Sequence, residues 1–522
     1  MTKKTEKRGI QQFAGVTLYE RKVSRYWETI SQWFAIVMLG LLPFLMDSQK
    51  YFNLTKARYI WFCVLTLLYI VCISVIALGF LLHKKAWIKR REEGFQKLNL
   101  SQYLILAYIF WAVLSSLVSP YRADTWLGQG RYEGLFTIIL YGLTFFLLSF
   151  WGEYTNKYAY TMGIMATVMS VLAFLQLFGV DFLTPEGYSI WETRFFATLG
   201  NIDCVSGVGA VVIPALLCAF VLLERKWRYV CLSGFVLYFY LQVFIDVDSG
   251  KIGLIAALLV LLPFLLDRWE RAMRTMIGLG ALLTTYAVAK LFPITQEGIG
   301  IAPGKKAIAA LILGAILVVL GIILEKKERT FRLNAKQVRR LVLVILLIAV
   351  AAALLFLYFY SGENRLLGEI HQVLHGELAD NAGSGRGIVW KLSIQFIQEM
   401  PIFGSGPDTY ISRAMPYYES GELRQVFDFA HNDFLQVGVC LGLGGLLIYL
   451  AWILSMAIRL LKRAVDNPLL LIFGGAMVGY LGHVFFSFSI ALVTPMFWVL
   501  AGLGDKCMRQ MTAPQPEKAE KK

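Results

Sequence analysis

Charged residues and cysteine pairs are scarce in this sequence, and each shortage excludes a class of protein. Only 16% of the 522 residues are charged, 57% are hydrophobic, and the mean hydropathy is +0.61, which excludes a soluble globule. Most of the seven cysteines lie in apolar runs, without metal-type spacing or obvious pairs, so we interpret them as small apolar residues. No soluble domain, internal repeat or low-complexity tract beyond a short polar tail is visible.

Long apolar runs recur along the whole chain, each near the ~20 residues that cross a bilayer as a helix. They predict an all-α, polytopic integral membrane protein with about 12 to 14 transmembrane helices. The candidate spans lie at about 28–47, 58–82, 101–118, 133–151, 158–178, 203–223, 228–246, 251–266, 274–292, 306–324, 341–360, 434–458, 467–486 and 489–504.

The net charge of +15 alone would be typical of a nucleic-acid-binding protein. The positions of the charges in the loops between the spans indicate membrane orientation instead. With Met1 in the cytoplasm and alternating spans, two basic loops fall inside, one from Lys84 to Lys97 and one from Lys326 to Arg340. The tail with Lys522 also falls inside, and about 35 of the 50 Lys and Arg are then cytoplasmic, as the positive-inside rule requires. We therefore predict membrane lipids as surroundings, no nucleic-acid partner, and both termini in the cytoplasm.

This orientation divides the chain into five parts. They are a cytoplasmic segment (1–27), eleven transmembrane helices (28–360), an exocytoplasmic catalytic loop (361–433), the C-terminal transmembrane helices (434–504) and a cytoplasmic tail (505–522). The first apolar run follows about 27 mostly polar residues, so it is predicted to be a signal anchor. A loop as long as 361–433 is usually functional. Its apolar pattern before Pro401 predicts short helical structure at the membrane surface.

Four basic residues from distant parts of the sequence fall on the exocytoplasmic side: Arg131, Arg194, Lys251 and Arg386. As a set they suit an anionic headgroup such as a diphosphate, because guanidinium groups bind phosphate oxygens through paired hydrogen bonds. Any single one would also fit a span end that reaches lipid phosphates. Asp246-Val-Asp248 matches a divalent-metal pattern, but a polar span terminus is the simpler interpretation, so no metal site is predicted.

His431 and Asn432 stand where the long polar segment ends and an apolar run begins. Helical steps from His431 reach Leu435, Gly438, Gly442 and Gly445, which predicts one helix face nearly bare of side chains. Another helix, or a lipid-linked substrate, would approach such a face closely. The alternative is a small-residue packing stripe beneath an ordinary loop histidine.

The same stretch resembles the signature of the O-antigen ligase and O-antigen polymerase superfamily, the Wzy-C type membrane enzymes. The shared pattern is His431-Asn432, nine residues, Gly442, two residues and Gly445. The blocks Gly383 to Trp390 and Pro401 to Pro407, Arg194 to Asp203, and Arg131 to Gly134 are also similar to stretches of that superfamily. Members transfer a glycan from a polyprenyl diphosphate carrier to a lipid, glycan or protein acceptor, at the outer face of the bacterial inner membrane.

The resemblance implies roles for individual residues. His431 would be the essential histidine and Arg386 the loop arginine, with Arg194 as a further contact to the diphosphate. Arg131 and Lys251 complete the predicted diphosphate-binding set, and Asn432, Gly442 and Gly445 would support the site. Many members have Ser-Arg-Gly or Ser-Lys-Gly where this chain has Ser249-Gly-Lys251, which leaves the role of Lys251 open. No cofactor is expected, and the motifs do not separate ligase from polymerase.

Elementary chemistry supports a mechanism without metal. Diphosphate is a good leaving group, and fixed cations stabilise the charge that develops on its oxygens. A neutral histidine then suffices to activate an acceptor hydroxyl, and the dipole of the following helix would keep His431 neutral. Attack opposite the leaving group inverts the sugar's anomeric carbon. Alternatively, His431 only binds diphosphate.

Two functions from other classes compete with the transferase. A transporter of lipid-linked oligosaccharides or ions would show charges inside spans and paired repeats, which this sequence lacks. A non-catalytic scaffold would leave the set of exocytoplasmic cations unexplained.

Overall fold

The structure is a computed structural model that describes residues 23, 25–82, 97–184, 188–224, 226–327, 329–380, 382–421, 423 and 426–510. Within these residues the regular structure is helical apart from a small antiparallel hairpin, β1 (Ile294–Thr295) with β2 (Gly298–Ile299), and one isolated bridge. The predicted all-α, multi-pass membrane fold is confirmed. The basic loop around Lys84 and the segments 1–22 and 511–522 lie outside the described residues.

Each predicted span coincides with a helix of the described chain. Eleven of these helices are long and apolar enough to cross a membrane: Arg25–Phe44, Lys50–Leu82 (with α2 at Leu54–Leu82), α4 (Leu100–Val118), α7 (Lys157–Leu177), α9 (Ile202–Leu222), α10 (Arg228–Ile245), α11 (Asp248–Leu265), α12 (Trp269–Leu291), α13 (Lys305–Glu325), α14 (Ala335–Tyr358) and α18 (Asp433–Ala464). The remaining predicted spans are the shorter helices α6 (Leu135–Trp151), α19 (Leu470–Val484) and α20 (Thr494–Gln510).

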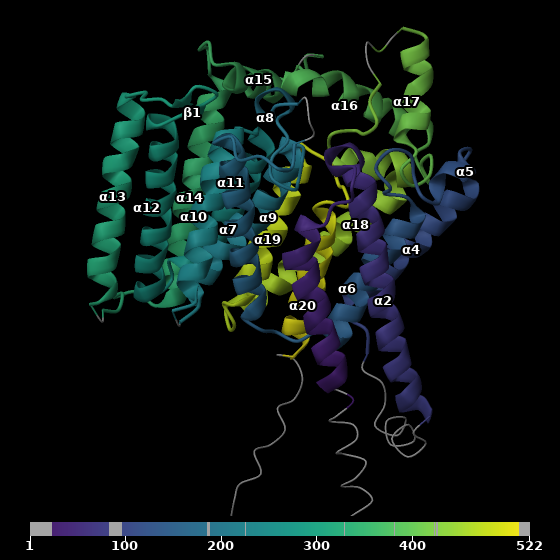
Figure 1. The fold of residues 1–522 in the computed structure, drawn as a ribbon, viewed down its shortest axis with the longest axis horizontal. Helices are drawn as coiled ribbons and strands as arrows, with labels where there is room; N and C mark the ends of the chain where they lie inside the picture. The colour runs from purple at the N-terminus through teal and green to yellow at the C-terminus, as the bar shows by residue number, and fades with distance from the viewer. Residues whose placement is uncertain are drawn as a thin grey trace, which may run out of the picture.

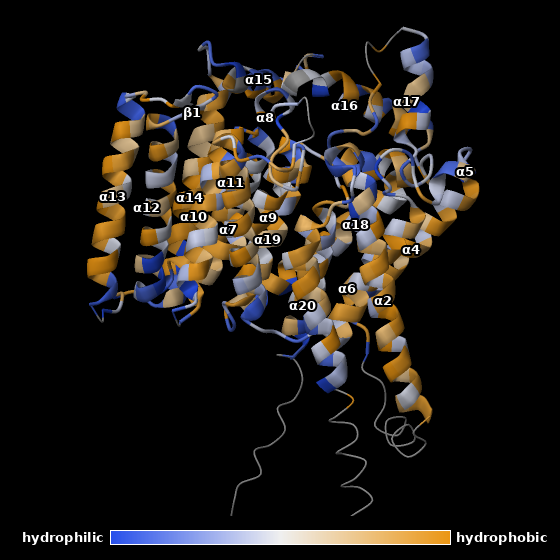
Figure 2. Cartoon of the chain, viewed as in Figure 1, coloured by the Kyte–Doolittle hydropathy of each residue, from blue (hydrophilic) through white to orange (hydrophobic). Residues whose placement is uncertain are grey.

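The spans form a bundle with α9 at its centre. In the apolar stretch of this helix, 94% of the residues are buried. This helix packs against α10, α11 and α19, while α12, α13 and α14 stand to one side of the bundle in Figure 1. Figure 2 shows a central apolar belt with polar residues at two opposite ends of the helices. A bilayer-spanning protein needs this distribution, because the lipid core offers no water to polar groups.

The described chain begins and ends at the same end of the bundle. Trp27, in the first helix, packs against Phe80 near the end of α2 and against Trp151 at the end of α6. Lys506, in the last turns of α20, donates a hydrogen bond to the carbonyl oxygen of Phe150 in α6. This placement fits the even number of spans predicted from the sequence. That the shared end faces the cytoplasm stays a prediction from the loop charges.

The opposite end, here called the site face, carries the segment 361–433. This segment contains α15 (Arg365–Leu374), α16 (Ala382–Glu399) and α17 (Tyr410–Glu419). Figure 1 shows α15 and α16 lying across the top of the bundle, roughly transverse to the spans, and α17 rising beside them. The helix predicted before Pro401 is therefore present as α16. A small apolar cluster that includes Val389, Phe396, Tyr410 and Val439 holds α16 and α17 against α18.

Short helices and turns complete the site face. They are η1 (Val37–Leu41) and η2 (Leu42–Phe44) at the end of the first helix, η3 (Lys50–Asn53), α5 (Arg122–Thr125) and α8 (Ile190–Thr193). The connections that contain Arg131, Arg194 and Phe488 reach the same face, because they join helices that end and begin there. Segments far apart in the sequence thus supply the candidate site together.

Candidate active site

His431 lies on the site face, immediately before α18. Asn432 is the N-cap of that helix, and its side-chain oxygen accepts a hydrogen bond of 3.0 Å from the backbone N–H of Leu435. The backbone of His431 has a φ of +50°, in the left-handed region that residues with a side chain rarely adopt. Such conformations persist only where surrounding contacts enforce them, and they cluster at functional sites.

Arg131 and Phe488 fix the chain just before His431. Arg131 donates two hydrogen bonds to the carboxylate of Asp428, at 2.9 and 3.1 Å, and its guanidinium lies 3.7 Å from the centre of the Phe488 ring. The imidazole of His431 meets the same ring edge-on, with centroids 5.6 Å apart. Arg131 is thus near the histidine, as a shared diphosphate site requires, but its guanidinium is bonded to a carboxylate.

The environment of His431 favours the neutral imidazole. Its pKa is lowered to about 4, first because burial removes the ring from water, and then because Arg386 and Arg131 are close, while Asp428 opposes them. The Nδ1 atom is buried without a hydrogen-bond partner among the described residues. The sequence predicted neutrality from the helix dipole, whereas burial and two arginines are the causes that the structure supplies.

Arg386 reaches this site from the beginning of α16. Gly383 and Gly385, with φ of +59° and +90°, provide the sharp turn there, and the Nη1 of Arg386 donates to the carbonyl of Gly383 at 3.2 Å. The guanidinium is close enough to act electrostatically on His431 and on Asp203, at the start of α9. Arg386, Arg131 and His431 are therefore brought together from three distant stretches.

Arg194 and Lys251 belong to a neighbouring group centred on the acidic pair. The Nζ of Lys251 lies 2.8 Å from Asp246 and 2.7 Å from Asp248, and Arg194 donates to the carbonyl of Ile245 at 3.1 Å. Burial alone would raise the pKa of Asp246, but Lys251 outweighs it and the pKa is lowered. The pair thus holds a lysine, as expected of a polar span terminus. Within the described ranges, no three Asp, Glu, His or Cys side chains gather closely enough to hold a metal ion.

Helix α18 is interrupted at Gly442, whose φ of +66° and ψ of −175° are not helical. The turn after α16 fills the interruption. The N–H of Ser405 donates to the carbonyl of Val439 at 3.0 Å, and the N–H of Leu443 donates to the carbonyl of Pro401 at 2.7 Å. These bonds satisfy backbone groups that the break leaves without helical partners. The block Pro401 to Pro407 therefore binds the block that begins at His431.

The approach of the two blocks requires glycine at position 442. A Cβ there would lie 2.2 Å from the carbonyl oxygen of Ile402, and its φ already disfavours any side chain. A Cβ added at Gly438 would lie 2.7 Å from Ile397 of α16, and one added at Gly445 would lie 3.2 Å from Trp111 of α4. The predicted single helix face that runs from His431 to Gly445 is wrong, but neighbouring elements do approach its glycines closely, as expected. His431 precedes the helix and Gly442 breaks it, so these residues do not share one helix face.

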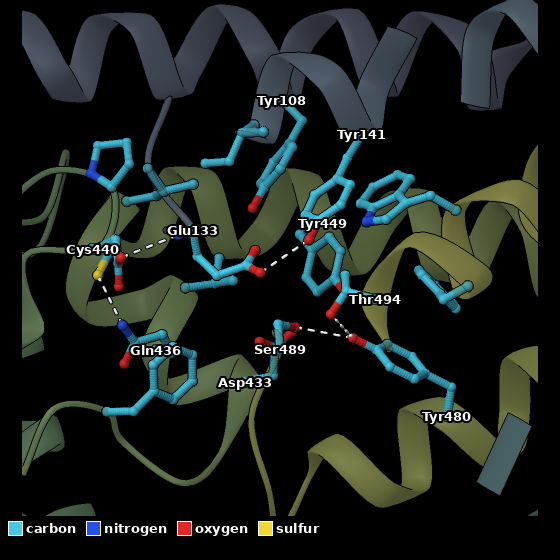
Figure 3. A pocket seen from close by; sticks show the side chains of 18 residues that line it. Tyr108, Glu133, Tyr141, Asp433, Gln436, Cys440, Tyr449, Tyr480, Ser489 and Thr494 are labelled. Atoms are coloured by element: carbon cyan, nitrogen blue, oxygen red, sulfur yellow. Dashed lines mark hydrogen bonds between the residues drawn. The ribbon is translucent and has the colours of Figure 1, made fainter. Parts of the chain in front are cut away.

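Two hollows adjoin the chain around His431. The arginine groove, about 250 Å³, is lined in part by Arg131, Asn201, Asp428 and Phe488. The acidic hollow, about 70 Å³, is lined by 18 residues that include Glu133, Asp408, Asp433 and four tyrosines (Figure 3). Sequence reasoning missed Asp428, Phe488 and the lining of the acidic hollow. Only Asp428 and Asp433, which flank His431 closely in the sequence, carried a local signal that could have found them.

A family model described as O-antigen ligase matches residues 298–450. The match runs from β2 through α17 into α18, so it includes Arg386, His431 and the interruption at Gly442, while Arg131 and Lys251 lie outside it. No curated protein matches the chain. This part of the chain, within a multi-pass helical fold, is therefore similar to the O-antigen ligase family.

Proposed function

We propose that the protein transfers a glycan from a polyprenyl (undecaprenyl) diphosphate carrier to a hydroxyl group of a glycan, lipid or protein acceptor, in cell-surface polysaccharide biosynthesis. The reaction would take place at the outer side of the bacterial cytoplasmic membrane, with the site face outward and both termini cytoplasmic. The observation that carries the proposal is His431, neutral, strained and partly exposed, near Arg386 and the Arg131–Asp428 pair. The match to the O-antigen ligase family supports glycan transfer over transport.

The proposed step breaks one bond and forms another. The acceptor oxygen attacks the anomeric carbon of the donor sugar while the bond from that carbon to the diphosphate oxygen breaks, which inverts the carbon. The electron pair leaves with the diphosphate, whose developing charge Arg386 stabilises. The hydroxyl proton passes to His431. Arg194 and Lys251 lie on the same face. They would contact the part of the donor diphosphate that Arg386 does not reach.

Donor binding itself would prepare the base. In the empty site, Arg386 and Arg131 both disfavour a protonated His431. A bound diphosphate brings negative charge to these arginines, which weakens their effect and raises the proton affinity of the imidazole. The histidine would then accept a proton only when the leaving group is in place. No metal or cofactor is part of this scheme.

Reconstitution in proteoliposomes with a defined polyprenyl-diphosphate glycan and candidate acceptors tests the function. We expect glycan transfer with release of the carrier diphosphate, and loss of transfer but retained donor binding in His431→Ala. His375→Ala is the matched control, because that histidine is exposed just after the end of α15 and stacks on Tyr358, which is not in the predicted set. A single addition to a separate acceptor indicates a ligase, whereas a ladder of lengths on the carrier indicates a polymerase. Donor that crosses the bilayer without losing its glycan would refute transfer.

A further inference from the structure

The arginine groove and the acidic hollow lie on opposite sides of two short chain segments. Asp428 lines the groove, whereas the next residue, Phe429, lines the hollow. Phe488 lines the groove, whereas the next residue, Ser489, lines the hollow. The rings of Phe429 and Phe488 touch, with centroids 6.0 Å apart. The wall between the two spaces is therefore built from the residues that surround His431.

Charge is divided across this wall. The groove side has Arg131, with Arg386 close to His431, and its one lining carboxylate, Asp428, is bonded to Arg131. The described residues that line the hollow include no Lys, Arg or His, but three carboxyl groups, from Glu133, Asp408 and Asp433. A diphosphate is attracted to the first side, whereas the second side offers it no cation.

Hydroxyl and carboxyl groups converge inside the hollow. The hydroxyl of Tyr141 donates to Glu133 at 2.9 Å, and that of Tyr480 lies 3.1 Å from Ser489 and 2.9 Å from Thr494. Figure 3 shows the carboxyl group of Glu133 in the middle of this space, between the tyrosines of several helices. Aromatic rings next to hydrogen-bonding groups give the hollow the mixed lining that polar organic ligands need for orientation.

Asp408 supplies an independent sign of a missing ligand. Its side chain is only 4% exposed and one oxygen accepts a 3.1 Å hydrogen bond from the N–H of Glu133, but its Oδ1 has no partner among the described residues. A buried carboxyl oxygen without a partner is costly, and a donor from a ligand would remove that cost. Burial raises the pKa of Asp408 and of Glu133 well above the usual range, and an anionic ligand group would raise both further, so a sugar carboxylate can enter only while these carboxyl groups stay protonated.

We infer that the acidic hollow is the acceptor subsite, which holds a hydroxyl-bearing or amino-bearing substituent of a sugar and rejects a sugar carboxylate. This inference rests on the proposed function, which places the donor diphosphate on the arginine side of His431 and the acceptor on the other. The hollow, of about 70 Å³, has room for such a substituent, because a water-sized group needs only ~10–15 Å³ of probe-occupied space. Oδ1 of Asp408 accepts a hydrogen bond from that group.

The test measures sugar binding without any donor lipid. The protein in nanodiscs is titrated with methyl glucoside, methyl glucosaminide and methyl glucuronide, and binding is followed by saturation-transfer NMR. We expect the neutral and amino glycosides to bind in the millimolar range and the glucuronide at least about tenfold more weakly. Asp408→Asn keeps an acceptor for the N–H of Glu133 but removes a carboxyl group that cannot ionise beside a sugar carboxylate, so it should narrow the discrimination between the glycosides to less than about threefold.

Two tyrosine variants distinguish a change in the lining of the hollow from a general effect on folding. Tyr449→Phe removes a hydroxyl that lines the hollow together with Asp433, and it should weaken neutral glycoside binding by about fivefold to tenfold. Tyr238 is also buried, but its hydroxyl donates to the carbonyl of Val205, outside the hollow. The Tyr238→Phe variant should therefore bind the glycosides like wild type. Equal losses in both variants would overturn the inference.

The outcomes also separate this inference from the proposed function. If none of the glycosides binds up to about 50 mM while reconstituted protein transfers glycan, the acceptor subsite is wrong and the function stands. If Tyr449→Phe changes the half-saturating donor concentration and not that of the acceptor, the hollow holds the donor sugar and the inference is overturned. If glycosides bind with the expected selectivity but no donor supports transfer, the hollow is a sugar site and the proposed function fails.

Discussion

The pH dependence of transfer tests whether His431 acts as a base in the environment that the structure describes. The lowering of its pKa from 6.5 to about 4 corresponds to about 3 kcal/mol of free energy against the imidazolium. A base works in its deprotonated form, so the rate should be lost as pH falls through the folded-state pKa. We therefore expect kcat/KM, which reports the free enzyme, to stay level from pH 8 to about 5 and to fall near pH 4.

Removal of one cause of the shift should move this acid limb. Arg386→Gln takes away the charge that lowers the pKa of His431 most, so this pKa should rise and the fall in kcat/KM should appear at higher pH, although the overall rate also drops. Lys251→Gln is the control, because Lys251 is paired with Asp246 and is not among the charges that act on His431. An acid limb near pH 6.5 in the wild type, or an unmoved limb in Arg386→Gln, would refute the reasoning.

Four further predictions concern the helix break, the loop arginine, the topology and metal. Gly442→Ala must place a side chain at positive φ against the Ile402 carbonyl and should lower stability by at least ~2 kcal/mol in thermal unfolding, whereas Gly79→Ala, with open space around its Cβ position, should not. Arg386→Lys keeps the charge but loses the two-pronged donor, so transfer should fall by about tenfold or more with normal insertion. A cysteine at exposed Ser420 should react with an impermeant label in intact cells; labelling only after permeabilisation would reverse the orientation. A chelator should leave the transfer rate unchanged, and a loss restored by added metal would refute the metal-free scheme.

The transmembrane helices and the helix in segment 361–433 could be predicted, because each has a pattern in its own local sequence. An apolar run of about 20 residues is itself the requirement for crossing a bilayer, so composition along the chain locates each helix. The helix before Pro401 was equally accessible, since an apolar face and a terminating proline are local features. The predicted and observed ends of helices still differ by a few residues where capping residues fix the end. Helix α18 begins at Asp433, fixed by the side chain of Asn432, and it continues to Ala464, beyond the predicted end at 458.

The contacts within the candidate site have no such local sequence pattern. Arg131 binds Asp428, 297 residues later in the chain, and neither residue has a pattern that specifies the other. Glu133, Asp408 and Tyr480 come from segments that only the tertiary fold brings to one hollow. The interruption at Gly442 was misread as part of a continuous stripe, because glycine at helical spacing looks the same whether a helix packs or breaks there.

The signature around His431 encodes mainly how the histidine is held. Asn432 caps α18 and so fixes where the helix begins, directly behind the strained backbone of His431. Gly442 breaks the helix, and the turn containing Ser405 docks into the break. That docking also positions Asp408, whose carboxylate binds the N–H of Glu133 beside Arg131. One series of hydrogen bonds, made by backbone and side-chain groups, thus links the helix break to both sides of the histidine. Substitutions at the glycine should therefore alter donor and acceptor handling together, whereas Arg386→Lys should act on the donor side alone.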